Sequence, residues 1–600
     1  MKLSDFVASF ISKYTKHVFL LPGGGNMHLI DSVGKDPNLE VVACLHEQGA
    51  AIAADGYAQF ANGLGVALVT TGPGGTNAIT GVAGAWVESV PLMILSGQVK
   101  TPDLKTDTKM RMLGFQEIDI VSIVSPITKY AVTVKDPQKI LYHLEEAIFH
   151  AKNGRPGPVW LDIPLDIQAA VIDTENLSSF KVSQQQESND KKQDIAKAVT
   201  KTIELLLQSK RPVILAGNGI RLSKAEALFF KVIEQLKLPV LTTWKACDLL
   251  EEEHPLFFGR PGTVAQRGAN FIQQNADFIL SLGCRLDFGQ IGYAQETFAR
   301  EARKVIVDID ELEFIKFRFE IDVKVGADVS EFLKEFEKEV SNVTLPDLKS
   351  WHDQCLKWKT NYPVVLQEYR NKKNSLSTYV LVDEISKQLV EKDVIVPCSS
   401  GSGADITSQS FKVKKGQRVL NSPGFGSMGF DIPQTIGACL ASGRRRTVCV
   451  VGDGGFQLNI QELETIKRLH LPIKFFYLNN QGYVSIRTTQ TNYFDKRFVA
   501  TGASSGLTLP DIRKISDAYG IANNRIGTQE ELVKGIEEAL ETDGPFICEV
   551  MIDPEEQVAP KVKSALGANG KMISKPLEDL APFLSREEFL ENMIVKPLEE

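Results

Sequence analysis

No two cysteines in this 600-residue chain form a C-x-x-C pair, although the chain contains eight of them. Their scattered positions predict neither a zinc site nor a disulfide framework and are typical of a reducing cytoplasm. No apolar run approaches the ~20 residues that a membrane-spanning helix needs. The N-terminal segment has no uninterrupted apolar core and does not predict a signal peptide. We therefore expect a cytoplasmic protein with no membrane partner.

An excess of basic residues is also absent. The chain has 67 Lys and Arg residues against 75 Asp and Glu residues, a formal net charge of -8. Because nucleic-acid binding selects for a basic surface, this balance argues against nucleic acid as a partner. Hydrophobic residues make up 43% of the chain, which is typical of a soluble globular protein.

Short apolar runs alternate with amphipathic stretches along most of the chain. Runs such as GVALV and VWLDI end in glycine or proline turns, which is typical of buried parallel strands, and helices are expected over 48–62 and 137–152. The length calls for about three or four domains, and a polar stretch at 178–195 is typical of a linker. The predicted fold class is α/β, with three doubly wound parallel-sheet domains. The predicted boundaries are 1–177 for the first domain, 194–345 for the central domain, 376–556 for the third and 557–600 for a C-terminal tail with no strand signal.

The strongest local signal is the pair of segments 452–455 (GDGG) and 479–483 (NNQGY), each directly after an apolar strand. One β-α-β unit would bring both to the carboxyl edge of a sheet, where ligands bind. Mg²⁺ prefers hard oxygen ligands and often shares them with phosphate, so Asp453, Asn480 and the carbonyl of Gly482 are candidate metal ligands. Either segment alone is more typical of a tight turn; the pair favours a site for a diphosphate and a metal ion.

The GDG, 24 residues and then NN resemble the diphosphate motif of thiamine-diphosphate enzymes. The stretch HEQGAAIAADGYAQFANG and the following TTGPGGTNAITG resemble the pyrimidine-binding domain of one branch, the acetolactate-synthase-like family. The resemblance covers nearly all of residues 1–560. It implies pyrimidine-binding, central and diphosphate-binding domains in that order, with thiamine diphosphate and Mg²⁺ as cofactors.

The resemblance assigns Glu47 of HEQGA as the carboxylate that activates the cofactor through its pyrimidine ring. The alternative for Glu47 is a plain helix-terminal charge. Met428 would support the bent cofactor from below, or else serve only as core filler, and Gly426 would accept from the pyrimidine amino group. Gln457 is a further candidate near the diphosphate. The remaining cofactor-binding candidates are Pro22, Thr70, Asn77, Ser400, Gly401, Ser402, Gly452, Asp453, Gly454, Gly455, Asn480, Gly482, Tyr483 and Val484.

Substrate positions follow from the same resemblance. Gly25, Gln98, Phe115 and Gln116 match positions that bind pyruvate, and Lys129 matches one near the substrate channel. The N–H group of Gly25 and the Gln98 amide would stabilise negative charge on a substrate oxygen. A plain turn at 22–26 and a strand-end amide at Gln98 are the ordinary alternatives.

Two departures from the family concern the reaction itself. Biosynthetic acetolactate synthases have a Trp shortly after the NN pair, where this chain has Ile486 and Arg487, so we expect a different acceptor pocket. A keto sugar would fit such a pocket, and Arg487 would then meet a phosphate. None of the eight histidines is adjacent to another, unlike in simple pyruvate decarboxylases. The C-terminal run from Lys571 to Phe589 is offered as a lid over the site.

The central domain resembles one that lines a site for FAD in acetolactate synthases. Arg285 matches a flavin-contacting position and Asp308 an acidic residue near the adenosine, but AGNGI departs from the usual glycine triplet. A domain that has lost its ligand is the alternative. The resemblance also implies a homo-oligomer, homodimer or homotetramer, with active sites between subunits.

The predicted activity is decarboxylation of pyruvate and transfer of the two-carbon unit to an acceptor carbonyl. Three alternatives remain open at this point. They are acetyl transfer to a nucleotide-linked keto sugar, simple 2-oxo-acid decarboxylation, and a non-catalytic binding protein with the same fold.

Overall fold

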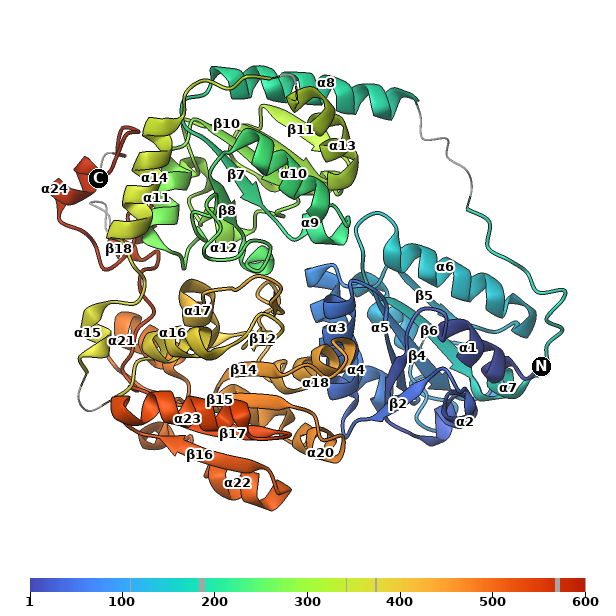
Figure 1. The fold of residues 1–600 in the computed structure, drawn as a ribbon. Coiled ribbons are helices and arrows are strands. Elements are labelled where there is room, and N and C mark those ends of the chain that lie inside the picture. The colour runs from blue at the N-terminus through green and yellow to red at the C-terminus, as the bar shows by residue number, and fades with distance from the viewer. Residues whose placement is uncertain (108, 183–188, 342, 373–374, 567–571, 599–600) are drawn as a thin grey trace. The chain divides into compact units, whose positions relative to one another are not determined.

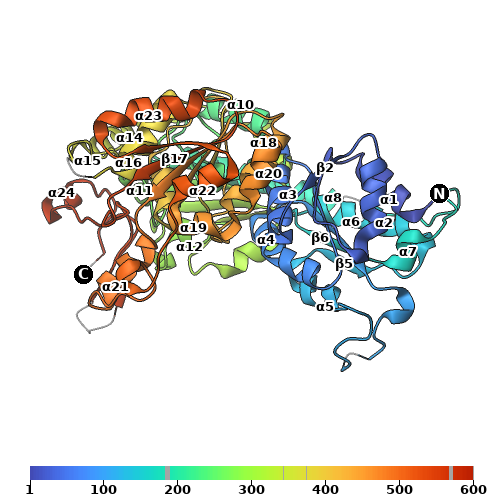
Figure 2. The same cartoon turned by 90° about the horizontal axis from the view of Figure 1, so that it is seen from below.

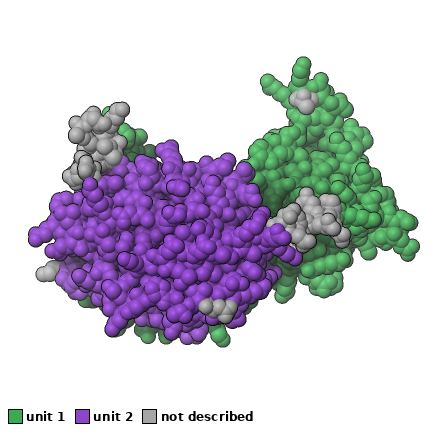
Figure 3. Space-filling view, turned by 90° about the horizontal axis from the view of Figure 1, so that it is seen from above, with its two compact units in different colours: residues 1–183, 392–404, 418–554 green, residues 184–391, 405–417, 555–600 purple. Residues whose placement is uncertain are grey.

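The computed structural model describes residues 1–107, 109–182, 189–341, 343–372, 375–566 and 572–598. The chain forms three parallel-sheet α/β domains, as the sequence predicted (Figure 1). It divides into two compact units (Figure 3). Unit 1 comprises 1–183, 392–404 and 418–554, and unit 2 comprises 184–391, 405–417 and 555–600. Because the units interleave along the chain, the domain boundaries proposed above stay predictions.

The first sheet of unit 1 has the strand order β2-β1-β3-β4-β6-β5, with all neighbours parallel. Its strands are β1 (His17–Leu20), β2 (Glu40–Ala43), β3 (Gly65–Val69), β4 (Leu92–Gln98), β5 (Tyr130–Thr133) and β6 (Val159–Pro164). Its helices are α1 (Leu3–Ile11), α2 (Met27–Lys35), α3 (Glu47–Ala61), α4 (Pro73–Glu88), α5 (Ile120–Val124), α6 (Ile140–Lys152) and α7 (Leu165–Ala169). The helices expected over 48–62 and 137–152 are α3 and α6.

Side chains of this sheet alternate between two hydrophobic clusters. On β3, Ala67 and Val69 pack in the cluster that contains α3 and α4, whereas Val66 and Leu68 pack with α1, α2 and α6. Successive residues of a strand point to opposite faces, so a strand covered on both sides must be apolar throughout. All five residues of β3 are buried.

The second sheet of unit 1 has the order β13-β12-β14-β15-β17-β16. Its strands are β12 (Val394–Pro397), β13 (Arg418–Val419), β14 (Thr447–Gly452), β15 (Ile473–Asn479), β16 (Ala522–Ile526) and β17 (Phe546–Met551). Its helices are α18 (Asp431–Ala441), α19 (Asp453–Phe456), α20 (Glu462–Arg468), α21 (Val484–Tyr493), α22 (Ile512–Tyr519) and α23 (Gln529–Glu541); α17 (Gly401–Ser410) is divided between the units. The segment that connects GDGG to NNQGY contains α20, whereas α19 begins within GDGG itself.

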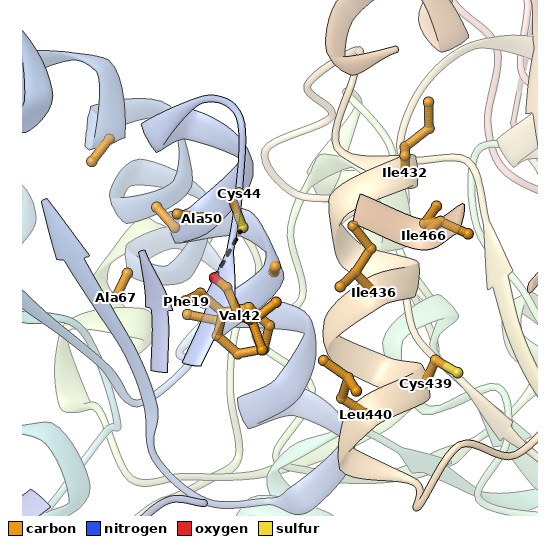
Figure 4. Packing of buried hydrophobic residues seen from close by; sticks show 14 of the residues in the cluster. Phe19, Val42, Cys44, Ala50, Ala67, Ile432, Ile436, Cys439, Leu440 and Ile466 are labelled. Carbon is orange, nitrogen blue, oxygen red and sulfur yellow. Dashed lines mark hydrogen bonds between the residues drawn. The ribbon is translucent and has the colours of Figure 1, made fainter. Parts of the chain in front are cut away.

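One hydrophobic core joins the two sheets of unit 1. Helices α3 and α18 lie side by side (Figures 1 and 2). Phe19 and Ala50 from the first half share a cluster with Ile436 and Ile466 from the second (Figure 4). Because this core is continuous, the loops at the ends of α3 and α20 are held in fixed relation to each other.

Unit 2 contains the central sheet, in the order β11-β10-β9-β7-β8. Its strands are β7 (Pro212–Ala216), β8 (Val240–Thr242), β9 (Phe278–Leu282), β10 (Arg303–Asp308) and β11 (Val323–Gly326). Its helices are α8 (Asn189–Gln208), α9 (Gly219–Leu222), α10 (Glu226–Leu236), α11 (Arg267–Asn275), α12 (Phe288–Ile291), α13 (Val329–Val340), α14 (Lys349–Asn361), α15 (Gln367–Arg370), α16 (Thr378–Gln388) and α24 (Arg586–Glu591).

Two expectations about connecting segments need correction. The linker predicted over 178–195 is wrong for its last part, because α8 begins at Asn189; residues 183–188 lie outside the described residues. The tail, which was expected to contain no strands, has the antiparallel pair β18 (Ser564–Leu566) and β19 (Met572–Ser574). No helix in the described part of the chain is long and apolar enough to cross a membrane.

Candidate functional site

Asp453 and the NNQG turn meet at the carboxyl edge of the second sheet of unit 1. Asp453 is 2% exposed. Its Oδ1 accepts from the N–H of Gly454 at 2.7 Å, and its Oδ2 accepts from the N–H groups of Asn480 at 3.1 Å and Gly482 at 3.0 Å. The two motif segments are thus joined directly, because parallel strands β14 and β15 end side by side.

Three groups converge here: the Asp453 carboxylate, the Asn480 side-chain amide and the Gly482 carbonyl. The side-chain oxygen of Asn480 lies 3.1 Å from Oδ1 of Asp453 and 2.7 Å from the carbonyl oxygen of Gly482. With no ion bound, the opposite amide orientation is the satisfied one, because the Asn480 NH2 group then donates to both oxygens. A hard cation at this point would be bound by the side-chain oxygen instead. Neighbouring ligands of an octahedral Mg²⁺ at about 2.1 Å lie about 3 Å apart, so the spacing fits this ion. Among the described residues no group of three or more His, Cys, Asp or Glu forms a metal cluster, which agrees with a ligand set that has a single carboxylate.

Burial raises the pKa of Asp453 to about 6, against the effect of the backbone N–H groups of Gly482, Gly454 and Asn480 and of the Arg487 charge. A carboxylate desolvated to this degree gains from a bound cation, which favours its ionised form.

At two positions of this region, Gly454 and Gly482, a side chain would collide with neighbouring atoms. Gly482 has a φ of +117°, and a Cβ there would lie 2.4 Å from the carbonyl oxygen of Thr501. A Cβ on Gly454 would lie 2.2 Å from the ring of Tyr483. The backbone therefore turns tightly at the metal-ligand candidates and presents the Gly482 carbonyl inward.

The other predicted contacts of the diphosphate end come from neighbouring loops. The Ser402 N–H donates to Ser485 at 3.0 Å, which joins the start of α17 to α21. Gly426 is left-handed, with a φ of +63°. Met428 is 43% exposed, so its side chain is accessible to a ligand rather than filling the core. The remaining candidates lie in loops or at helix starts at or near this edge of the sheet: Ser400, Gly401, Gly452, Gly455, Gln457, Tyr483 and Val484.

Glu47 is the first residue of α3 and is 6% exposed. His46 caps this helix by accepting from the N–H of Gln48 at 3.0 Å. The Glu47 Oε2 accepts from the Asn77 side chain on α4 at 3.0 Å. Asn77, predicted as a cofactor contact, is thus the residue that orients the Glu47 carboxylate.

The first sheet gathers the predicted substrate residues at its carboxyl edge, but their polar groups already have partners. The Gly25 N–H donates to Thr70 at 3.2 Å. The Gln98 side chain is 2% exposed and donates to Asp162 and to the Ile118 carbonyl, both at 3.1 Å. Pro22 is exposed at the end of β1. Neither predicted oxyanion donor is free in this structure.

Phe115 and Gln116 lie in the long loop between β4 and α5. Phe115 is 82% exposed, and the Gln116 backbone is left-handed and lies against Gly72. Lys129 precedes β5 and donates to the carbonyls of Asn153 and Arg155 at 2.6 and 2.7 Å. In the strand register Lys129 is level with Leu92, at the opposite end of the sheet from Gln98, about six residues of strand away, or roughly 20 Å.

Arg487 has a different role from the predicted phosphate contact. One of its terminal nitrogens donates to the carbonyls of Gln481 and Thr501 at 2.8 and 2.9 Å, and the other to those of Asn480 and Pro554 at 2.6 and 3.1 Å. Each terminal nitrogen carries two hydrogens, so all four are used. The expectation of a substrate phosphate at Arg487 is corrected: this side chain braces the metal-ligand turn.

The run predicted as a lid begins at Lys571, outside the described residues; its later part contacts the central domain, and its action as a lid stays a prediction. In unit 2, Arg267 donates to the carbonyls of Leu580 and Pro582 at 3.1 and 2.6 Å, and Asn270 to that of Leu577 at 2.6 Å. The tail from Leu577 onward is therefore bound to α11 of the central domain.

Arg285 follows β9, and Asp308 is the last residue of the neighbouring strand β10. Arg285 has a φ of +56° and pairs with Asp287 at 2.8 Å. Asp308 ends β10 and accepts from the N–H of Asp310 at 3.0 Å. The AGNGI loop places Gly219 against Gly283, where a Cβ on either would lie within 2.7 Å of the other's Cα.

Sequence reasoning missed two buried acids, Glu88 and Glu462. Both accept from backbone N–H groups of loops far away in sequence. Glu462 lies in a helix among other polar residues and Glu88 is the last residue of one, so no local motif marks either as a buried acid.

The geometry can be compared with known proteins. Three thiamine pyrophosphate enzyme domain families match the chain: the N-terminal TPP binding domain over residues 1–123, the central domain over 199–336 and the C-terminal TPP binding domain over 400–550. The chain is 32% identical to the acetolactate synthase large subunit of Cyanidium caldarium, over 91% of this chain and 92% of that protein. It is 30% identical to the acetolactate synthase isozyme 2 large subunit of Escherichia coli (strain K12), over 93% and 96%. With the domains in the expected order and near-complete coverage, this chain belongs to the thiamine-pyrophosphate enzyme family, as an acetolactate-synthase-like enzyme.

Proposed function

We propose that this enzyme decarboxylates a 2-oxo acid, pyruvate, with thiamine diphosphate and Mg²⁺, and transfers the two-carbon unit to an acceptor carbonyl. The observation that carries the proposal is the convergence of three oxygens, from Asp453, Asn480 and Gly482, at a strand edge. This donor set suits Mg²⁺ shared with a diphosphate. The full-length likeness to acetolactate synthase large subunits supports the same chemistry.

The residues at the metal end would hold and neutralise the diphosphate. Asp453, Asn480 and the Gly482 carbonyl would bind Mg²⁺. The backbone at Gly452, where a Cβ would meet nothing within 4 Å, leaves room for a diphosphate oxygen. When bound, thiamine diphosphate supplies the carbon nucleophile and electron sink that decarboxylation of a 2-oxo acid needs.

The residues at the pyrimidine end would control one proton. Glu47, oriented by Asn77, would bond to the pyrimidine ring and exchange a proton there. Met428 offers an apolar side chain that is accessible as the support for the bent cofactor. The Gly426 carbonyl is the proposed acceptor for the pyrimidine amino group. Arrangement of these loops before the cofactor arrives lowers the cost of orienting it.

The substrate end is less complete within one chain. Gln98 and the Gly25 N–H can stabilise a substrate oxygen only if they exchange their present partners, Asp162 and Thr70. Phe115 and Gln116 lie on an exposed loop, which suits a site completed by a second subunit. We therefore propose a homo-oligomer with active sites between subunits, in the cytoplasm.

The acceptor is proposed to be a second 2-oxo acid, with a keto sugar as the second candidate. The chain has no Trp after its NN pair, which favours a pocket unlike that of biosynthetic acetolactate synthases. Arg487 gives little support to a phosphate-bearing acceptor, because the four hydrogens on its terminal nitrogens are engaged.

FAD in the central domain is a separate proposal. Arg285 and Leu286 are consecutive left-handed residues at the carboxyl edge of the central sheet, a conformation that is often retained at binding sites. The absorbance spectrum of the purified protein tests it. A flavin band near stoichiometric amount supports FAD, and its absence after purification and reconstitution with FAD contradicts it.

The decisive experiment measures CO₂ release and products from pyruvate alone, with added thiamine diphosphate and Mg²⁺. We expect acetolactate or acetoin, and loss of CO₂ release in Glu47→Gln but not in the exposed Glu530→Gln control. Acetaldehyde as the main product would favour simple decarboxylation instead. A panel of acceptors added to the same assay then separates 2-oxo acids from keto sugars.

A further inference from the structure

Glu462, in α20, holds the backbone directly in front of Glu47. Its side chain is 0% exposed. One carboxylate oxygen accepts from the N–H of Leu45 at 2.9 Å and from that of His46 at 3.1 Å. Glu47 is the next residue and begins α3. A carboxylate from the second half of unit 1 thus fixes the chain where the proposed activating residue begins.

The same face of α20 makes further contacts with this loop. Thr465 donates to the second carboxylate oxygen of Glu462 at 2.7 Å. Arg468 donates to the carbonyl of Ala43 at 2.7 Å. Residues three apart lie on one face of a helix, so these three side chains form a strip along the loop. The strip holds both the N–H and the C=O groups of the segment that connects β2 to α3.

Gly49 shows that this contact is built into the HEQGA segment. A Cβ at Gly49 would lie 2.6 Å from the Glu462 carboxylate oxygen that accepts from Leu45 and His46. Only glycine lets the carboxylate approach the start of α3 this closely.

Glu88 makes the reciprocal contact. It ends α4 of the first half and is 4% exposed. Its carboxylate accepts from the N–H of Gly424 at 2.6 Å and from that of Phe425 at 3.4 Å. The loop it holds continues directly into Gly426 and Met428, the proposed pyrimidine contacts.

We propose that Glu462 and Glu88 are positioning residues: each half of unit 1 uses one buried carboxylate to set the loop with which the other half contacts the cofactor. Glu462 sets the position of Glu47, and Glu88 sets that of Gly426 and Met428. The inference rests on the proposed function, since it takes Glu47 as the carboxylate that acts on thiamine diphosphate. A displacement of about 1 Å at such a group can slow a reaction about 100-fold.

The test measures hydrogen–deuterium exchange at the C2 position of bound thiamine diphosphate, by acid quench and NMR, in the full chain with Mg²⁺. Glu462→Ala is expected to slow exchange by about 10- to 100-fold at saturating cofactor, because the loop before Glu47 loses its anchor. Glu462→Gln retains an oxygen for both N–H groups and should exchange within about 3-fold of the wild type, roughly the scatter of a neutral change. Glu464→Ala, on the exposed side of α20, is the matched control.

Affinity for thiamine diphosphate and the unfolding temperature are measured in parallel, because a merely structural role would lower stability without changing the exchange rate. If Glu462→Ala does not fold, Gly49→Ala pushes the carboxylate away from the other side of the contact, and Glu462→Asp withdraws it by one methylene. Unchanged exchange at C2 in a folded Glu462→Ala, Gly49→Ala or Glu462→Asp variant overturns the inference.

Glu47→Gln separates the inference from the function on which it rests. If Glu47→Gln abolishes exchange and the Glu462 variants do not slow it, the function stands and the positioning role is wrong. If Glu47→Gln also leaves exchange unchanged, the proposed function itself fails. For the reciprocal contact, Glu88→Ala should weaken cofactor binding at least about 10-fold, because the N–H groups of Gly424 and Phe425 lose their acceptor. Glu88→Gln should restore binding, because its side-chain oxygen can still accept from both. Equal binding in Glu88→Ala overturns that half of the proposal.

Discussion

One terminal atom of the Asn480 side-chain amide lies 2.7 Å from the carbonyl oxygen of Gly482. Without an ion its NH2 group donates to that carbonyl, and its oxygen can turn to a cation that both residues share. Asp453 is the third group of this site. Its second carboxylate oxygen accepts from the N–H groups of Asn480 and Gly482. The site is therefore organised before an ion binds, and Asp453 is the one charged group among the three proposed ligands.

The Asp453→Asn substitution removes that charge and retains the shape. We expect the Mg²⁺ concentration for half-maximal activity to rise by about 100-fold or more, because a hard divalent ion prefers a carboxylate oxygen to an amide. Titration of activity and of cofactor-induced thermal stabilisation with Mg²⁺ measures it. Asp495→Asn, on an exposed part of the chain, should behave as the wild type. A normal Mg²⁺ requirement in Asp453→Asn would remove this residue from the metal site.

Arg487 connects the metal-ligand turn to two other segments. Its four hydrogen bonds reach Asn480 and Gln481 in the turn, Thr501 in the following loop and Pro554 after β17. Lysine retains the charge but not the planar array of donors. We therefore expect Arg487→Lys to raise the Mg²⁺ requirement about 10-fold, the cost of about one hydrogen bond to a charged group.

The control for Arg487→Lys is Arg513→Lys, at an exposed position, which should leave the Mg²⁺ requirement unchanged. The alternative role, recognition of an acceptor phosphate, predicts a different result: an unchanged Mg²⁺ requirement and a raised KM only for a phosphorylated acceptor. Kinetics with Mg²⁺ and with each acceptor varied in turn distinguish the two.

The strands that the sequence revealed and those it did not reveal differ in burial. The central strands β4, β14 and β17 are buried almost throughout, so their apolar runs are plain. In the three parallel sheets, the strands that the sequence did not reveal are β2, β5, β11, β13 and β16, and each lies at a sheet edge. On β16 only one of five residues is buried. An edge strand is covered on fewer sides, so it tolerates polar residues and loses the periodic signal.

The site shows the same limit at the level of single residues. The cofactor-motif residues Glu47, Asp453 and Asn480 could be chosen from the sequence, because short motifs retain them at fixed spacing. Arg487 was placed in the right neighbourhood with the wrong partner, since four backbone carbonyls carry no residue type that a sequence can display. Gln98 was placed on the correct edge, but its hydrogen bond to Asp162 spans 64 residues.

The C-terminal tail is predicted to stabilise the central domain through Asn275. This side chain is 0% exposed, donates to the carbonyl of Asn592 at 3.1 Å and accepts from the N–H groups of Ile594 at 2.7 Å and Val595 at 3.0 Å. Asn275→Ala removes the partner of these three groups, of which the Val595 N–H is buried and the other two are part-buried, at about 1 kcal/mol each. We expect a loss of about 3 kcal/mol and earlier proteolytic release of the tail.

Thermal unfolding and limited proteolysis measure these effects, with the exposed Asn371→Ala as the control. If the tail acted instead as a lid over the cofactor, Asn275→Ala would change KM at normal stability. That outcome would contradict the docking of the tail on α11 as its main role.

Asp162 gives a prediction about pH. It is 1% exposed on β6, and burial raises its pKa to about 6 from the ordinary 3.8, against the hydrogen bonds from Ser96, Gln98 and Thr133. Between these two values the folded protein retains a proton that the unfolded chain releases. The contribution of this group to stability is therefore full below about pH 4 and is lost as the pH rises through about 6, by roughly 3 kcal/mol at most.

Asp162→Asn cannot titrate, so its stability relative to the wild type should rise by up to roughly 3 kcal/mol between pH 4 and 7. The new amide nitrogen also faces the Gln98 side chain, which adds a cost that does not depend on pH. The slope of the difference, and not its absolute value, is therefore diagnostic. Urea unfolding at several pH values measures it, and Asp353→Asn, at an exposed position, should give a flat difference. A flat difference for Asp162→Asn as well would mean that this carboxyl is ionised in the folded protein throughout the range, with its three hydrogen-bond donors outweighing the cost of burial.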